Sequence, residues 1–290
     1  MQNNKDIEVL PIEQKVIFCD IDGTLIDDEK LVHTHTLQKI QDLVNNHYDY
    51  HFALASGRNL AEELFLYKRM QLKNTGLLIG SNGAQIYALK SHKIIFEKTI
   101  DSSIVKKIYD EFLRLNEKCH HIGLMVTYSD NSSYLFNFNE DEWWENYNFN
   151  KSKRRNEFST DKVLIINLFA LLETKKEMLN FLDKLEINVI PGPNLTAITA
   201  KNASKEDAIK FCIKHYNLEL KNIAVIGNSK NDKGMFMLPD VFSITYTGAK
   251  PYLKDIAKLV IDEPKSQFIK EGLIQFEQYI NNINKNKEKN

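Results

Sequence analysis

The stretch VIFCDIDGTLID, residues 16–27, begins as an unbroken apolar run and then places three carboxylates around a glycine. The run Val16–Cys19 predicts a buried strand, because continuously apolar strands are typical of parallel sheets covered on both faces. Residues i and i+2 of an extended chain project to the same side, so Asp20 and Asp22 are expected to lie close together. Such carboxylates repel each other, and a divalent cation or a phosphate ligand changes that balance. The alternative is a solvated acidic turn, although D-x-D-G-T is much rarer than D-x-D.

Short apolar runs alternate with helical patterns on both sides of a different middle section. The expected helices are 35–47, 59–70, 102–118, 173–185 and 203–216, and the expected strands of the first pattern are 51–56, 76–81, 223–227, 242–246 and 258–261. The middle section has hairpins between its helices, beginning with 84–89 and 93–100. We therefore expect an α/β fold with a Rossmann-like parallel-sheet core and helices on both faces. Residues 1–84 and 195–290 would form this core, and residues 85–194 an inserted α+β cap.

Composition excludes several classes of partner and compartment. The 290 residues carry a formal net charge of -1, so no basic field predicts a nucleic-acid partner. The first 15 residues contain no apolar core of a signal peptide, and no apolar run is long enough to span a bilayer. Three scattered cysteines, Cys19, Cys119 and Cys212, argue against a disulfide framework. We expect a protein of the reducing cytoplasm that does not enter membranes.

Polar residues follow four of the expected core strands. In open α/β sheets, ligands bind beyond the carboxyl ends of the strands. The four sets are Asp20 with Asp22, Ser56 with Gly57 and Arg58, Ser81 with Asn82 and Gly83, and Gly227 with Asn228. Each set alone is compatible with an ordinary loop, but four sets at one sheet edge predict a site.

Two of these segments suggest contacts with an anion. The Ser56 hydroxyl can donate to a phosphoryl oxygen, and Gly57 and Arg58 would open the next helix, whose N-terminus favours anions. The alternative is a serine that only caps this helix. Lys205 follows Ser204 in the capping pattern S-K-E-D, which fixes it in a first helical turn. A cation there opposes the helix dipole, so Lys205 is either a surface residue or is held by an anion.

The segment GNSKND, residues 227–232, follows the strand that ends at Gly227. Asn231 or Asp232 would cap the next helix. Asp232 could also reach a bound cation or Lys205, while the alternative is a capped turn without a ligand.

These motifs together resemble a known family. The segments DIDGT (20–24), SGR (56–58), the lysine at 205 and GNSKND (227–232) resemble the four motifs of haloacid dehalogenase-like phosphatases. The segment SNGA (81–84), the inserted cap and TGAKPYLKDIA (247–257) resemble the Cof-type branch, whose cap is of type C2. The resemblance covers nearly the whole core and is specific for fold and reaction.

The resemblance implies a role for each matching residue. Asp20 would be the nucleophile, Asp22 the acid that protonates the leaving oxygen and then activates water, and Thr24 a support for that loop. The phosphoryl group or substrate would be bound by Thr24, Ser56, Gly57, Arg58, Asn82, Lys205 and Asn231, with Lys205 also counted as catalytic. A Mg²⁺ cofactor would be held by Asp20, the Asp22 backbone carbonyl, Asn228 and Asp232.

One residue departs from the family pattern, which usually has Asp where this chain has Asn228. An amide oxygen can still bind Mg²⁺ but contributes no formal charge. We predict weaker metal binding, with Asp232 moving inward to compensate. The leading function is a Mg²⁺-dependent hydrolase of small phosphorylated metabolites, foremost sugar phosphates, acting through an aspartyl phosphate. One alternative is a phosphomutase of the phosphomannomutase type. The other is a protein that binds phosphorylated ligands but is a weakened catalyst because of Asn228.

Two further groups of residues have a functional and a structural interpretation. Substrate contacts in the cap could come from the aromatic and basic residues Trp143, Trp144, Tyr147, Lys151, Lys153, Arg154 and Arg155. The favoured alternative is structural: the aromatic residues form a hydrophobic anchor, and the basic residues are a solvated run of charges. The segments Cys119-His120-His121 and His33-x-His35 lack zinc spacing, so structural or surface roles are expected for both.

Overall fold

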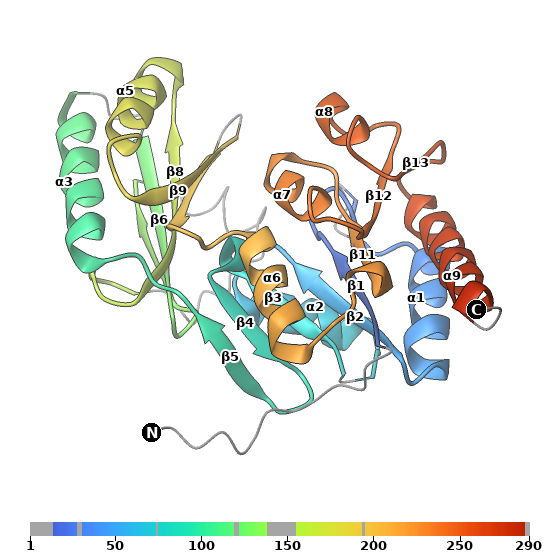
Figure 1. Ribbon diagram of the computed structural model, residues 1–290. Helices are drawn as coiled ribbons and strands as arrows, with labels where there is room; N and C mark the ends of the chain where they lie inside the picture. Colours follow the sequence, from blue (N-terminus) through green and yellow to red (C-terminus); the bar gives the residue numbers. More distant parts are fainter. Residues whose placement is uncertain are drawn as a thin grey trace.

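The computed structural model describes residues 14–27, 31–73, 75–118, 122–137, 155–192 and 195–287. Within these ranges the strands form two sheets that lie in two lobes (Figure 1). The order of the larger sheet is β13 (Leu259–Ile261), β12 (Phe242–Tyr246), β11 (Ile223–Ile226), β1 (Lys15–Cys19), β2 (Tyr50–Ala55), β3 (Leu77–Gly80), β4 (Gln85–Ala88) and β5 (Lys93–Glu97). The order of the smaller sheet is β7 (Ser133–Phe136), β6 (Ile122–Tyr128), β8 (Val163–Ala170), β10 (Leu195–Ala200) and β9 (Ile187–Pro191).

The opening stretch forms the central strand of the larger sheet. β1 pairs in parallel with β11 on one side and with β2 on the other. Its side chains alternate between two separate cores, with Ile17 and Cys19 in one and Val16 and Phe18 in the other. Because both faces of the sheet are buried, every position of β1 must be apolar or shielded, which explains the unbroken apolar run.

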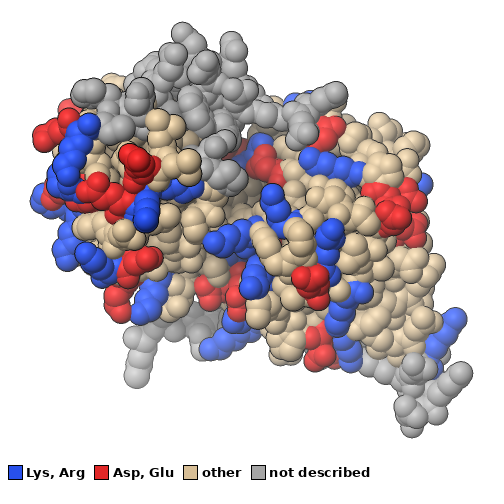
Figure 2. Space-filling view, turned by 90° about the horizontal axis from the view of Figure 1, so that it is seen from above, with Lys and Arg blue, Asp and Glu red and all other residues tan. Residues whose placement is uncertain are grey.

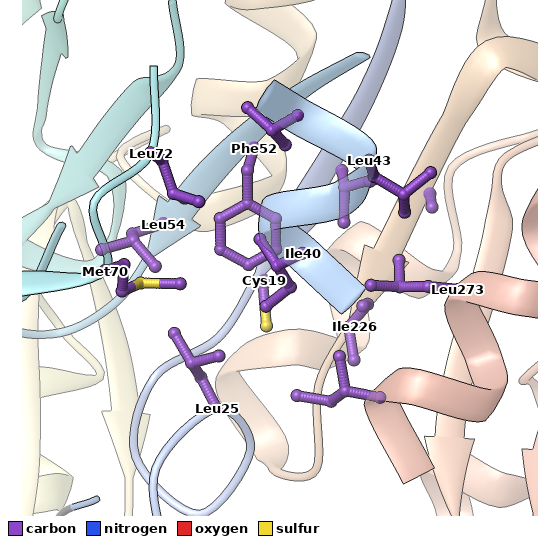
Figure 3. Close-up of a cluster of buried hydrophobic side chains, with 14 of the residues drawn as sticks. Cys19, Leu25, Ile40, Leu43, Phe52, Leu54, Met70, Leu72, Ile226 and Leu273 are labelled. Atoms are coloured by element: carbon purple, nitrogen blue, oxygen red, sulfur yellow. The ribbon is translucent and has the colours of Figure 1, made fainter. Parts of the chain in front are cut away.

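Helices cover both faces of the larger sheet, which confirms the predicted fold class. α1 (Thr34–Asn46), α2 (Leu60–Arg69) and α9 (Phe268–Lys287) contribute to the core that contains Ile17. Figure 3 shows part of this core, where Phe52 of β2 lies among Leu43 of α1, Cys19 and other apolar side chains. α6 (Lys205–Tyr216), α7 (Lys233–Phe236) and α8 (Pro251–Lys254) cover the opposite face. None of the helices in the described ranges is both long and apolar enough to cross a membrane.

The smaller sheet is antiparallel and carries its helices on one face only. α3 (Ser102–Lys118) and α5 (Leu172–Leu182) pack on the face that points away from the larger sheet (Figure 1). Even-numbered residues of the central strands, such as Ile166 and Leu168 of β8, belong to this core. The odd-numbered residues therefore lie on the other face, which is turned toward the first lobe.

The sheets divide the chain at other points than the expected boundaries at 84/85 and 194/195. β4 and β5 pair onto β3 and extend the larger sheet, so the chain enters the smaller lobe only after β5. β10 pairs with both β8 and β9, so it belongs to the smaller sheet. The predicted hairpin is present, but its edge pairing with β3 places it in the core lobe. The strand β10 itself was missed, which put the second boundary too early.

Candidate active site

Asp20 lies directly after the central strand β1, at the carboxyl edge of the parallel strands. Asp20 is only 4% exposed to solvent. The Thr24 hydroxyl donates to Asp20 Oδ2 at 2.9 Å, and the Lys205 ammonium donates to Asp20 Oδ1 at 2.6 Å. The solvated acidic turn is therefore wrong for Asp20, because its carboxylate is buried and held on both oxygens.

Lys205 is the first residue of α6 and is 1% exposed. Ser204 caps this helix as predicted, accepting a hydrogen bond from the Asp207 backbone N–H at 3.1 Å. The Lys205 ammonium also donates to Asp232 Oδ1 at 2.7 Å. Of the two interpretations of this lysine, the one in which anions hold it is correct.

The turn at 81–84 packs closely against the start of α6. Gly83 has a φ of +99°, and a Cβ at this position would lie 2.0 Å from the Ser204 carbonyl oxygen. Only glycine fits both the left-handed conformation and this approach. The turn therefore helps to fix the helix end from which the Lys205 side chain reaches Asp20.

The buried cluster of Asp20, Lys205 and Asp232 has two carboxylates for one ammonium. Burial and the charge of Asp232 raise the pKa of Asp20 to about 7, although the Lys205 charge acts in the opposite direction. Burial lowers the pKa of Lys205, but the charges of Asp20 and Asp232 outweigh it and leave that pKa raised. With all three groups ionised the cluster carries one excess negative charge, which a cation would neutralise.

Asp232 anchors the loop at 228–232. Its Oδ2 atom accepts from the backbone N–H groups of Asn228 and Ser229 at 3.0 and 2.9 Å. Ser229 caps the short 3₁₀ turn that precedes α7. Asp232, one of the two expected residues, occupies the N-cap position of α7, but its side chain forms no capping hydrogen bond to that helix. Asn231 instead donates to Asn82 Oδ1 at 3.1 Å, joining two of the strand ends. Protein donors therefore occupy both Asp232 oxygens.

Asn228 is oriented by a hydrogen bond to the first loop. Its Nδ2 atom donates to the Gly23 carbonyl at 2.7 Å. Because that partner is an acceptor, it must face the amide nitrogen, which leaves Asn228 Oδ1 buried and without a hydrogen-bond partner among the described residues. Gly23 has a φ of +78°, and a Cβ there would lie 2.4 Å from Asn228 Nδ2. The contact therefore requires glycine at 23.

These oxygens fit a hard cation such as Mg²⁺. The described residues contain no group of three His, Cys, Asp or Glu side chains placed to hold a metal. A cation would depend on the Asp20 carboxylate, the unpartnered Asn228 Oδ1 and a backbone carbonyl, all of which are oxygen ligands. The excess negative charge of the cluster favours the same occupant.

Asp22 pairs with Arg58, and its side chain is 58% exposed, unlike that of Asp20. Both of its oxygens accept from Arg58, at 2.9 Å from Nε and 2.6 Å from Nη2. Ser56 is buried, and its hydroxyl oxygen accepts from the Arg58 backbone N–H at 3.1 Å. Arg58 therefore links the loop after β1 to the loop after β2.

The helix after β2 begins later than expected. Its cap is Asn59, which forms a reciprocal capping box with Glu62, and neither Gly57 nor Arg58 lies in α2. Ser56 is thus not the helix cap, and its hydroxyl remains at the strand end. The pattern N-x-x-E at 59–62 is a capping-box signal that could have identified this start.

A cavity of about 530 Å³ opens over the cluster, between the two lobes. Figure 2 shows a hollow there, with basic and acidic side chains at its edge. Of the predicted site residues, those that line it are Asp20, Asp22, Ser56, Gly57, Arg58, Asn82 and Asn231. Thr24, Lys205, Asn228 and Asp232 are not among the lining residues and instead support them from beneath. Sequence reasoning missed the cavity wall that the smaller sheet supplies.

Among the other predicted candidates, the described residues Arg155 and His33 do not line this cavity. Residues 138–154, with both tryptophans, Tyr147 and most of the basic run, lie outside the described residues, as do 119–121. Arg155 pairs with Asp130 at 3.0 Å and lies over the Tyr128 ring, as the structural interpretation expected. His33 pairs with Asp27 at 3.0 Å.

Comparisons with known proteins agree with this architecture. A Mycoplasma pneumoniae protein whose name assigns it provisionally to the phosphatases is 25% identical over 275 residues, 88% of this chain and 93% of its own length. A Buchnera aphidicola protein named in the same way is 27% identical, covering 76% of this chain and 82% of its own length.

Solved structures share the fold. A sugar phosphatase described as a member of subclass IIB of the haloacid dehalogenase (HAD) superfamily has a TM-score of 0.74 at 20% identity. The match covers 91% of this chain and 99% of the other chain. A Thermotoga maritima structure has a TM-score of 0.73 at 23% identity, covering 89% and 97%. Residues 17–271 match the family model described as haloacid dehalogenase-like hydrolase, and the chain therefore belongs to this family.

Proposed function

We propose that the protein is a Mg²⁺-dependent phosphomonoester hydrolase that acts on small phosphorylated metabolites through an aspartyl phosphate at Asp20. The observation that supports it best is the buried cluster in which Lys205 bridges Asp20 and Asp232 at the floor of the cavity. A carboxylate held against an ammonium at the carboxyl edge of a parallel sheet is suited to attack on a bound phosphoryl group.

The first half of the reaction transfers the phosphoryl group to the protein. An Asp20 carboxylate oxygen forms a bond to phosphorus while the bond from phosphorus to the substrate oxygen breaks. Asp22, in its protonated form, gives its proton to that leaving oxygen, and the alcohol departs. Because Arg58 now holds the Asp22 carboxylate, this step requires that Asp22 leave Arg58 and turn toward the leaving oxygen.

The second half releases phosphate. The Asp22 carboxylate takes a proton from a water molecule, whose oxygen attacks the phosphorus of the aspartyl phosphate. The Asp20–phosphorus bond breaks, Asp20 is restored as a carboxylate, and Asp22 is again protonated. Splitting the hydrolysis in this way replaces one difficult displacement with two easier ones.

Charge stabilisation comes from the groups around the phosphoryl position. Lys205 and the Ser56 hydroxyl can contact the equatorial oxygens, where negative charge spreads during transfer. Asp20, Asn228 Oδ1 and the Asp22 carbonyl would hold Mg²⁺, which when bound neutralises phosphoryl charge. The Asn228 oxygen, which has no partner among the described residues, supports the proposal of a metal-dependent enzyme over that of a protein that only binds phosphorylated ligands.

Phosphate release from para-nitrophenyl phosphate with Mg²⁺, with Asp20→Asn as the blank, tests the proposal. We expect release by the wild type and none above background by the variant or in the presence of EDTA. Equal release by both proteins would contradict the proposal. Turnover that requires a bisphosphate activator and yields no net phosphate would instead identify a phosphomutase.

The substrate class and compartment remain part of this proposal. Sugar phosphates are the class named for one structural neighbour, and they are the first candidates for that reason. Cys19 and Cys212 are buried free thiols, which supports a reducing compartment such as the cytoplasm.

A further inference from the structure

A chain of side-chain hydrogen bonds joins the loop after β11 to the turn after β3. The Ser229 hydroxyl donates to Asn231 Oδ1 at 2.6 Å, and Asn231 Nδ2 donates to Asn82 Oδ1 at 3.1 Å. All three residues line the cavity, and Asn82 is a buried residue. The chain therefore runs along the edge of the sheet at which Asp20 lies.

The two distances fix the direction of this chain. The separation of 2.6 Å between Ser229 Oγ and its partner is typical of an O–H donor and an oxygen acceptor, whereas N–H donors lie farther from their acceptors. The oxygen of the Asn231 amide therefore faces Ser229, and its nitrogen faces Asn82. Because that nitrogen can only donate, Asn82 must present its own oxygen to it.

The Asn82 nitrogen forms the free end of the chain. None of the residues in the described ranges accepts a hydrogen bond from Asn82 Nδ2, and this atom, unlike Asn228 Oδ1, is not sealed from solvent. It therefore borders the cavity that Asn82 lines. An amide nitrogen carries two N–H donors, so the chain ends in a donor that a ligand in the cavity can use.

The loop after β2 holds this amide beside the proposed phosphoryl position. The Asn82 backbone N–H donates to the Ser56 carbonyl at 2.8 Å. A Cβ at Gly57 would lie 3.3 Å from Asn82 Nδ2 and 3.4 Å from Asn82 Oδ1, so the amide packs directly over Gly57. The Asn82 donors are thus next to Ser56, whose hydroxyl is assigned above to the phosphoryl oxygens.

We propose that Asn82 donates a hydrogen bond to the phosphoryl group and that Asn231 is a positioning residue, which sets the polarity of the Asn82 amide. This inference rests on the proposed function. A donor that is already oriented stabilises the negative charge that spreads over the phosphoryl oxygens during transfer. The reversed amide would direct an oxygen at the same group and repel it. Asn231 thus acts through Asn82, whereas the sequence resemblance implied that both bind the ligand directly.

Asn231→Asp tests this role because it keeps the shape of the side chain and reverses its polarity. The new carboxylate still accepts from Ser229 but cannot donate to Asn82. Asn82 must then turn its nitrogen toward residue 231 and its oxygen toward the phosphoryl group. The added negative charge also repels phosphate by itself. A double-mutant cycle with Asn82→Ala separates the two effects, because only the reversal requires the Asn82 amide.

Two quantities are measured at saturating Mg²⁺, kcat/KM for para-nitrophenyl phosphate and the Kd of inorganic phosphate by calorimetry. We expect Asn82→Ala to lower kcat/KM by about 10²-fold and to weaken phosphate binding. Asn231→Asp should lower both by a factor that is larger, by about tenfold or more, when Asn82 is present than when it is replaced by alanine.

Equal factors in the two backgrounds would show that Asn231→Asp acts through its charge alone, which would overturn the inference. An Asn82→Ala protein with unchanged kcat/KM and Kd would overturn it as well. If the wild type binds phosphate but hydrolyses no ester, the proposed function fails, and the cycle of Kd values still decides the inference. If it does neither, both fail.

Thermal unfolding shows whether each variant folds. If Asn231→Asp does not fold, the cycle is run with Asn231→Ala, which releases the Asn82 amide without reversing it. That change should give a smaller loss that again depends on Asn82, and equal factors in the two backgrounds would again overturn the inference.

Asn137→Asp is the matched control. Asn137 Nδ2 donates to Asn116 Oδ1 in the smaller lobe, and neither residue lines the cavity. The variant breaks the same kind of amide pair and adds the same charge, so kcat/KM and Kd should stay unchanged. Losses equal to those of Asn231→Asp would show that any broken amide pair has this effect, and would overturn the inference.

Discussion

The two walls of the cavity differ in how their residues are held. Beneath the core wall, which the larger sheet supplies, charged groups are buried and paired, as in the contacts of Lys205 with Asp20 and Asp232 at 2.6 and 2.7 Å. On the wall that the smaller sheet supplies, hereafter the cap wall, the described residues are mostly apolar, and the amide of Asn167 has no partner among them. A paired, pre-organised wall is suited to one chemical step, whereas an apolar wall with a free amide is suited to selection. The groups of the proposed reaction therefore come from the larger sheet, and the smaller sheet supplies the opposite wall.

The largest effect is expected from Asp20→Asn, which removes the nucleophile. Phosphate release should fall by at least about 10⁴-fold, because no covalent intermediate can form. The fold should persist, since Lys205 would still pair with Asp232. Asp27→Asn, in the same stretch but paired with His33, is the matched control and should retain activity. Comparable losses in both variants would contradict the role of Asp20.

Lys205→Met should damage activity and stability together. Removing the ammonium leaves two buried carboxylates unpaired, and breaking such a pair costs about 3–5 kcal/mol. Lys210→Met is the control, because Lys210 lies on the same helix in an exposed pair with Glu206. Thermal unfolding should show a large loss for the first variant and a change within about 0.5 kcal/mol for the second. Similar unfolding temperatures would show that the buried charges are not coupled as described.

Asn228→Asp should change metal affinity more than turnover. It adds a negative charge at the proposed Mg²⁺ position, so the Mg²⁺ concentration for half-maximal activity should fall by about tenfold. It also replaces the donor to the Gly23 carbonyl with an acceptor, so the metal-free protein should unfold at a lower temperature. Mg²⁺ titrations and melting curves with EDTA measure both effects. Equal metal affinities would remove the proposed role of residue 228.

The smallest effect is expected at Glu63, an acidic residue on α2 that is fully buried. Neither of its carboxyl oxygens has a hydrogen-bond partner in the part of the chain that the structure describes, and burial raises its pKa well above the usual value. A raised folded-state pKa costs stability as pH rises above about 4, where the unfolded chain ionises, up to the folded-state pKa. Glu63→Leu should therefore stabilise the protein by about 2 kcal/mol at neutral pH, and by less at pH 5.

Thermal unfolding at the two pH values measures this effect. Glu63→Gln serves as the second variant, because it keeps the shape of the side chain but cannot ionise. It should reduce the pH dependence in the same way. Stability gains that do not depend on pH in either variant would show that Glu63 is not neutral in the folded protein.

The core wall could be predicted from sequence because its geometry is local. Each polar set directly follows an apolar strand, and parallel strands bring their carboxyl ends to one edge. Asp20, Ser56, Asn82 and Asn228 were located in this way. The pairing of Asp22 with Arg58 could not be predicted, because it depends on side-chain directions in two loops 36 positions apart.

The cap wall could not be predicted because it depends on the register between strands that are distant in sequence. Asn167 and Ala197 become neighbours only when β8 and β10 pair. β10 was not recognised, since LTAITA contains small residues and gives a weak apolar signal. The candidates for substrate contacts predicted from sequence were the aromatic and basic residues of the run at 143–155, which stand out in composition.

Reductive trapping of the intermediate tests the central claim most directly. The wild type is mixed with acetyl phosphate and Mg²⁺, quenched with borohydride and analysed by peptide mass spectrometry. Borohydride reduces an acyl phosphate of aspartate to homoserine. The account predicts homoserine at position 20 only when both substrate and Mg²⁺ are present. Phosphate release with an unmodified Asp20, or trapping at another carboxylate, would contradict it.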